Sequence, residues 1–120
     1  MESSELKNIT ISQRGSEICE ELKELGFFNS AVEAYRSAIC LAIAKKIPVD
    51  ANIKGVLNKW DTASVFRDPD SNIEALMLLD GYAPEEIVEK GKLLVESGLR
   101  FIEEKRLANA DLLSILIGQG

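Results

Sequence analysis

The stretch from Lys7 to Lys46 reads KNITISQRGSEICEELKELGFFNSAVEAYRSAICLAIAKK, and it decides the fold. Its hydrophobic pattern begins with a period of two and then changes to helical spacing. A period of two is typical of a half-buried strand, and recurrence at three and four residues is typical of an amphipathic helix. The stretch therefore predicts one short strand followed by two helices.

The strand is predicted from the alternation of polar and β-branched apolar side chains at its start. Ile9 and Ile11 are expected to face the core, whereas Asn8, Thr10 and Ser12 are expected to face outward. A strand this short is not stable alone. Because no second strand of similar quality follows nearby, we expect it to pair with the same strand of a second copy.

Two helices are expected to follow, with a glycine turn between them. The first covers Gln13 to Leu25, and Gly26 is placed to end it. The second begins at Ser30-Ala31-Val32-Glu33, a sequence typical of a capping box, and continues to about Lys46. Apolar residues cover nearly its whole circumference, so it must be buried on several sides. A 40-residue segment cannot bury such a helix alone, and we expect a dimer core to do so.

The remainder of the chain is expected to be helical after a connection over residues 48–70. Ser71-Asn72-Ile73-Glu74 is a second capping-box match and predicts a short helix through Leu79, ended by Gly81. Pro84 suits the first turn of a longer helix that reaches about Lys105. Asn109 or Asp111 is expected to cap a last helix.

The longer helix carries an apolar stripe that is expected to be core, with a protein-docking surface as the alternative. Two of its positions are glycines, which allow close approach of another helix. The stripe consists of Ile87, Gly91, Leu94, Val95, Gly98, Leu99 and Ile102.

Composition argues against several classes of function. The 120 residues contain no histidine, which removes histidine-dependent nucleophilic catalysis and most zinc sites. Cys19 and Cys40 are expected to be small buried hydrophobes, and the turn residues Asp68 and Asp70 are not expected to bind metal. We therefore expect a non-enzymatic protein without a cofactor or a metal site. Trp60 is expected to be a packing anchor.

The net charge of −6 opposes non-specific binding to nucleic acid, because phosphate neutralisation by Lys and Arg supplies most of that affinity. Residues 1–48 hold six basic and seven acidic residues, whereas residues 49–120 hold eight basic and thirteen acidic ones. The first segment is therefore the one that can approach DNA. The polar start of the chain does not resemble a signal peptide, and no apolar run is long enough to span a bilayer, so we expect a cytoplasmic protein without a membrane partner.

The stretch from Lys7 to Lys46 resembles the ribbon-helix-helix family of DNA-binding proteins. The features that match are the alternating strand, the amphipathic first helix, Gly26 at the turn, the polar pair Asn29-Ser30 and the apolar second helix. The resemblance implies a mainly α fold in which residues 6–47 form an interleaved homodimer with one short strand per chain. Residues 71–120 then form a helical C-terminal region.

The same resemblance implies that an intersubunit ribbon enters the major groove of double-stranded DNA. Its base contacts are then Asn8, Thr10 and Ser12, which are polar but uncharged. Its phosphate contacts are Lys7, Arg14 and the start of the second helix at Asn29 and Ser30. These assignments predict a dimeric transcriptional regulator. The alternative is a dimerisation module without DNA binding, in which Thr10 and Ser12 simply face solvent.

The whole chain also resembles small accessory proteins of bacterial DNA sulfur-modification (phosphorothioation) and restriction systems. The matching features are the ITIS strand, the stretch GFFNSAVEAYRSAICLA and the late stretch ALMLLDGYAPEEIVEKGKLLVESGLRFIEEK. This resemblance predicts a non-enzymatic interaction protein of a defence system. A third reading is an antitoxin whose toxin-binding region covers Ile87 to Ile117. The accessory protein is expected to use the same dimer without reading a DNA sequence, whereas the antitoxin reading implies a protein partner at the C-terminal helices.

Overall fold

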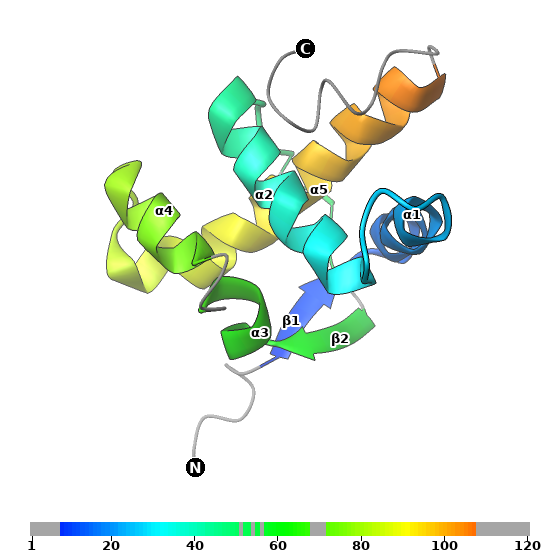
Figure 1. Cartoon of the computed structure of the whole chain (residues 1–120). Coiled ribbons are helices and arrows are strands. Elements are labelled where there is room, and N and C mark those ends of the chain that lie inside the picture. The colour runs from blue at the N-terminus through cyan, green and yellow to red at the C-terminus, as the bar shows by residue number, and fades with distance from the viewer. Residues whose placement is uncertain (1–7, 51, 54, 56, 68–71, 108–120) are drawn as a thin grey trace.

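The computed structural model describes residues 8–50, 52–53, 55, 57–67 and 72–107. This part of the chain is mainly helical and contains a two-stranded sheet, so the prediction of a mainly α fold is confirmed. In chain order the elements are β1 (Asn8–Ile11), α1 (Gln13–Glu24), α2 (Ala31–Lys45), β2 (Leu57–Asp61), α3 (Thr62–Phe66), α4 (Ile73–Leu79), the 3-10 helix η2 (Pro84–Glu86) and α5 (Ile87–Leu107). Figure 1 shows α2 and α5 crossing at the centre, with α1 on one side and α4 on the other.

The boundaries of α1 and α2 follow from local chemistry. Ser12 caps α1 by accepting the N–H of Gly15, and Ser30 caps α2 by accepting the N–H of Glu33. Between the helices, Gly26 has a φ of +87°, a backbone conformation that glycine adopts without the strain of a β-carbon. The predicted starts of both helices and the glycine turn are confirmed.

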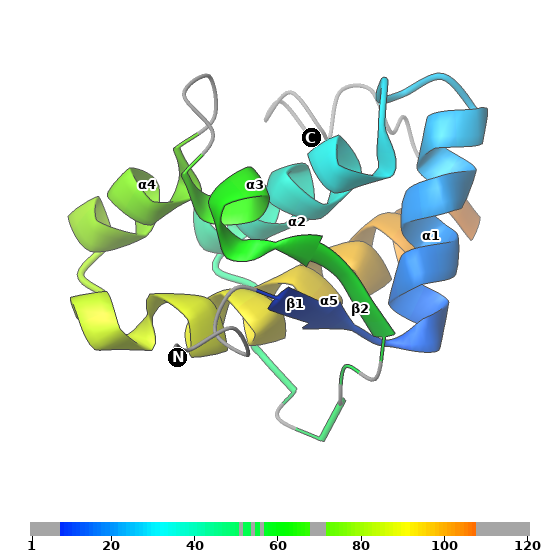
Figure 2. The same ribbon diagram turned by 90° about the horizontal axis from the view of Figure 1, so that it is seen from below.

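The pairing of β1 differs from the expectation. β1 pairs antiparallel with β2 of the same chain, and Figure 2 shows the two strands side by side. Ile9 lies opposite Trp60 and Thr10 opposite Asn58, so Lys59 is an extra residue in β2. The prediction of one strand per chain is wrong, because β2 forms within the segment 48–70 that was expected to be a connection, and α3 follows it there. β2 carries only weak alternation, and its pairing with β1 across 45 intervening residues leaves no local signal.

The burial of α2 is also achieved within one chain. α2 packs against α1, α3, α4 and α5, and six of its residues are buried. The sequence argument for a second copy assumed that the segment Lys7–Lys46 had to bury α2 by itself. Because α3, α4 and α5 cover α2 within one chain, the burial of α2 no longer argues for a second copy. The homodimer stays a prediction of the family resemblance.

The packing of α5 against α2 depends on Gly98. A β-carbon added there would lie 2.2 Å from the carbonyl oxygen of Ala38 on α2. At Gly91 an added β-carbon would lie 2.6 Å from the Phe66 ring. Gly98 therefore allows the close approach of another helix that was predicted, whereas Gly91 makes room for a side chain.

The apolar stripe on α5 is core, as predicted. All seven of its positions are buried, and α5 packs against α2, α1 and β1. Ile11, Ile18 and Leu22 from the N-terminal segment join the same core. Leu25, the last residue predicted for the first helix, is 58% exposed, because it lies at the C-cap beyond the last packed turn of α1.

The short helix α4 is close to its prediction. Its N-cap is Asn72, whose side chain accepts the N–H of Ala75, and Gly81 with a φ of +102° follows its end. Ser71, Asp68 and Asp70 lie outside the described residues, as does the predicted last helix after Asn109.

Several smaller expectations are tested by the packing. Cys19 is fully buried and Cys40 half-buried, which supports their reading as small hydrophobes. Trp60 packs edge-on against Tyr35 with ring centroids 5.2 Å apart, as a packing anchor does. Among the helices that the structure describes, none is long and apolar enough to cross a bilayer.

Candidate functional site

Ser12 does not face outward as the sequence predicted. It is 8% exposed, and its side chain is used at the start of α1. The Ser12 hydroxyl accepts the N–H of Gly15 at 3.0 Å and donates to Oε1 of Glu96 at 2.7 Å. The expected orientation is wrong because Ser12 is the N-cap, where the chain leaves the strand and its side chain turns back to the helix.

Glu96 on α5 is the centre of a buried polar cluster. It is 2% exposed, and its Oε2 accepts the backbone N–H of Ser12 at 2.8 Å. Arg100, one turn later, lies 3.4 Å from Oε1 of Glu96 and 3.5 Å from the Ser12 hydroxyl. The Glu96 carboxylate thus lies at the N-terminus of α1, where a negative charge is favourable. The cluster joins β1 and α1 to α5.

Thr10 and Tyr35 lie beside this cluster. Thr10 is half-buried, and its carbonyl accepts the Tyr35 hydroxyl at 3.3 Å. Burial raises the pKa of Tyr35 well above its usual value, and the nearby Glu96 adds to the effect. Gly55 packs so closely on Thr10 that a β-carbon there would lie 2.6 Å from the threonine hydroxyl. The side chains of Lys7 and Asn8 are outside the described residues.

Arg14 is held by carboxylates of its own chain. It forms ion pairs with Glu17 at 3.0 Å, with Glu21 at 3.1 Å and with Glu103 of α5. Arg106 of α5 lies 2.6 Å from the other oxygen of Glu21. Together these pairs connect α1 with the C-terminal half of α5. A DNA phosphate would have to compete with these carboxylates for Arg14.

The start of α2 is likewise occupied. Ser30 accepts the N–H of Glu33 at 3.3 Å, and the Glu33 carboxylate accepts the N–H of Asn29 at 3.0 Å. This is a variant of the predicted capping box in which the glutamate reaches one residue further back. The chain's own carboxylate therefore takes a position that a phosphate was expected to fill.

Glu21 offers a test of the α1–α5 ion pairs. The hydrogen bond from Arg106, with a smaller contribution from Arg14, lowers the pKa of the Glu21 carboxyl. Because the pKa of Glu21 is lower in the folded state than in the unfolded state, these pairs stabilise the fold at pH values above the unfolded pKa. That stabilisation is lost as the pH falls through the folded pKa. In a carboxyl-detected NMR titration, Arg106→Gln should raise the pKa of Glu21 more than Arg14→Gln does. An unchanged pKa in Arg106→Gln would contradict the pairing.

Sequence reasoning missed Glu96 and Arg100. Their position next to the apolar stripe gave no sign of burial, and Ser12 is 84 residues away from Glu96. In a sequence, a buried carboxylate next to an apolar stripe cannot be distinguished from a solvent-exposed one, because the partner that buries it is not known. In the part of the chain that the structure describes, no three carboxylate or thiol groups gather as metal ligands.

A different surface lies at the end of α4. Leu79 is 87% exposed and Leu78 is 44% exposed. We call this pair the α4 tip. Figure 1 places α4 beside the start of α5, at the far side of the molecule from α1. Carboxylates follow the tip along the chain, and the exposed ones are Asp80, Glu85, Glu86 and Glu89.

Comparison of the chain with protein-family models, with curated proteins and with solved structures finds no match in any of the three.

Proposed function

We propose that this protein is a non-catalytic interaction protein that binds a basic protein partner through the α4 tip. The observation that carries the proposal is the exposure of two consecutive leucines, Leu78 and Leu79, which are followed along the chain by exposed carboxylates. Single exposed leucines are ordinary on protein surfaces, whereas an apolar pair with a polar rim is typical of an interaction site.

Charge defines the chemistry of the partner. From Ile73 to Lys90 the sequence has five carboxylates and one cation, a net charge of −4, although two of the carboxylates form ion pairs with cations outside this range, Glu74 with Arg67 and Glu89 with Lys92. A second copy would bring the same negative charge against this surface, and like charges across an interface oppose association. A partner with an apolar side chain flanked by Lys or Arg complements it. The resemblance to accessory proteins of DNA-modification systems supports an interaction role of this kind.

The contacts within the chain make DNA a less favoured partner. Ser12 is buried against Glu96, Arg14 is paired with carboxylates, and the start of α2 is capped by Glu33. DNA contact through β1, and the homodimer that such a ribbon needs, remain predictions of the family resemblance.

Site-specific photo-crosslinking in the producing cells tests the proposal. A photo-reactive phenylalanine analogue at position 78 should give one main crosslinked protein, whose contact peptide carries net positive charge. Leu79→Ser should reduce the yield about tenfold, since burial of a leucine side chain contributes roughly 1.5–3 kcal/mol. Leu25→Ser is the matched control, because Leu25 is also an exposed leucine but lies at the end of α1.

Three results would overturn this assignment: no crosslinked partner, an equal loss of yield in Leu25→Ser, or a contact peptide with net negative charge. The DNA alternative has its own readout. Binding of the purified protein to duplex DNA at low salt, with affinity that falls steeply as salt rises, would favour the ribbon mechanism instead. Sedimentation at micromolar concentration decides between monomer and homodimer.

A further inference from the structure

A second site is suggested by an open pocket between α5 and the segment that follows α2. Its volume is about 410 Å³, within the range of pockets that bind small molecules. The lining side chains come from α5 and from the chain that follows α2. They are Ile47, Pro48, Asp50, Ile53, Ser97, Arg100, Phe101 and Glu104.

Ser97 at the floor of this pocket is the observation that points to a ligand. It is 6% exposed, and its buried hydroxyl has no hydrogen-bond partner among the described residues. A helical serine ordinarily bonds to a carbonyl one turn earlier or to solvent. A buried polar atom without a hydrogen-bond partner destabilises the fold, so the unpartnered Ser97 hydroxyl needs a functional explanation.

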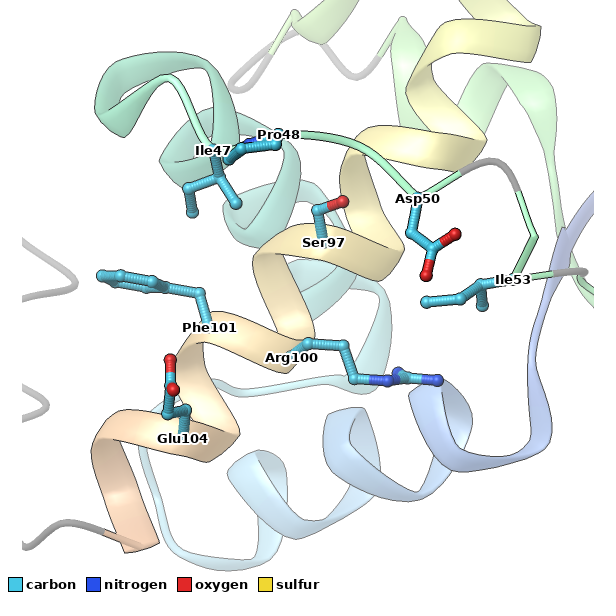
Figure 3. A pocket seen from close by; sticks show the side chains of 8 residues that line it. All are labelled: Ile47, Pro48, Asp50, Ile53, Ser97, Arg100, Phe101 and Glu104. Carbon is cyan, nitrogen blue, oxygen red and sulfur yellow. The ribbon is translucent and has the colours of Figure 1, made fainter.

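The two ends of the pocket differ in chemistry. Figure 3 shows Asp50, Arg100 and Ile53 on one side of Ser97, and Ile47, Phe101 and the Glu104 carboxylate on the other. Arg100 makes two long hydrogen bonds, to Glu96 at 3.4 Å and to Ser12 at 3.5 Å, so most of its five N–H donors are not used by them. Asp50 uses Oδ1 to accept the N–H of Asn52, and among the described residues no donor is bonded to its other oxygen.

We propose that this pocket binds a small zwitterion of the amino-acid class with an apolar side chain. Its carboxylate pairs with Arg100 and accepts the Ser97 hydroxyl, while its ammonium group pairs with Asp50. Its side chain lies on Phe101 and Ile47. The pocket lining carries groups of both signs, so it favours a ligand that carries both charges, since either charge alone leaves one protein group unmatched.

Calorimetric titration with three probes tests the charge pattern. L-Phenylalanine should bind at millimolar concentration or below, whereas 3-phenylpropionate, which lacks the ammonium, and phenethylamine, which lacks the carboxylate, should each bind about tenfold more weakly, the effect of one charge-assisted hydrogen bond. Asp50→Asn should weaken phenylalanine about tenfold and leave 3-phenylpropionate unchanged. Asp80→Asn, outside the pocket, is the control.

Ser97→Ala separates a binding role from a structural one. It removes the unpartnered hydroxyl, so the variant should unfold at a higher temperature than the wild type and yet bind phenylalanine several-fold more weakly. Absence of phenylalanine binding overturns the proposal, as does equal affinity for all three probes or an unchanged affinity in Asp50→Asn. None of these outcomes bears on the α4 tip, which lies on other residues.

Discussion

Replacing Gly98 with alanine is expected to destabilise the protein by about 3 kcal/mol, a value typical of severe overpacking in a core. Helix propensity alone favours alanine over glycine by roughly 1 kcal/mol. The new methyl group would, however, lie 2.2 Å from the Ala38 carbonyl oxygen, and a backbone atom within α2 cannot move aside as a side chain can. The two central helices must separate. Urea unfolding monitored by circular dichroism measures the change.

Gly91→Ala is the matched control for this prediction. It places the same methyl group on the same helix, but its contact at 2.6 Å is with the end of the Phe66 side chain. A ring can shift, and the gain in helix propensity offsets part of the cost, so the expected change is within about 1 kcal/mol. Equal stability of the two variants would show that the crossing of α2 and α5 is not as close as described.

Replacing Glu96 with alanine is the second large effect, again about 3 kcal/mol of destabilisation. Hydrogen bonds to a charged group contribute roughly 1.5–3 kcal/mol, and a buried donor without an acceptor adds a further penalty. Both apply, because Glu96 accepts the backbone N–H and the hydroxyl of Ser12. The pair with Arg100 adds little, since that side chain is 33% exposed and its charge is screened by solvent.

Two further variants make the Glu96 prediction specific. Glu96→Gln keeps the size and one acceptor oxygen, so it should recover part of the loss. Glu89→Ala removes an exposed carboxylate from the same helix and should change stability by no more than about 0.5 kcal/mol. If Glu96→Ala behaves like Glu89→Ala in urea unfolding, the carboxylate does not hold β1 and α1 to α5.

Much of the local structure could be predicted from the sequence. The alternation around Ile9 and Ile11 predicts β1, the caps Ser30 and Gly26 place the turn between α1 and α2, and the stripe on α5 predicts its buried face. Each signal lies within a few residues of the structure it predicts, because backbone hydrogen bonds and side-chain periodicity act over that distance.

The candidate sites could not be predicted in the same way. Ser12 looked like an outward strand residue, and only its contact with Glu96 across 84 positions shows that it is a buried cap. Arg14 looked available to phosphate until Glu103 was found beside it. The exposure of the Leu79 and Ser97 side chains depends on which surfaces the neighbouring helices cover. A sequence pattern does not contain that information.

The stretch from Lys7 to Lys46 by itself determined a strand, two helices and a turn, because those features follow from local periodicity and capping. The partner of β1 was decided only by the tertiary structure. β2 pairs with it from the same chain, and α5 covers α2 through Gly98, so the chain buries its own apolar surface. Long-range packing determines which side chains stay exposed, and here it leaves the α4 tip exposed and Ser97 in the lining of a pocket.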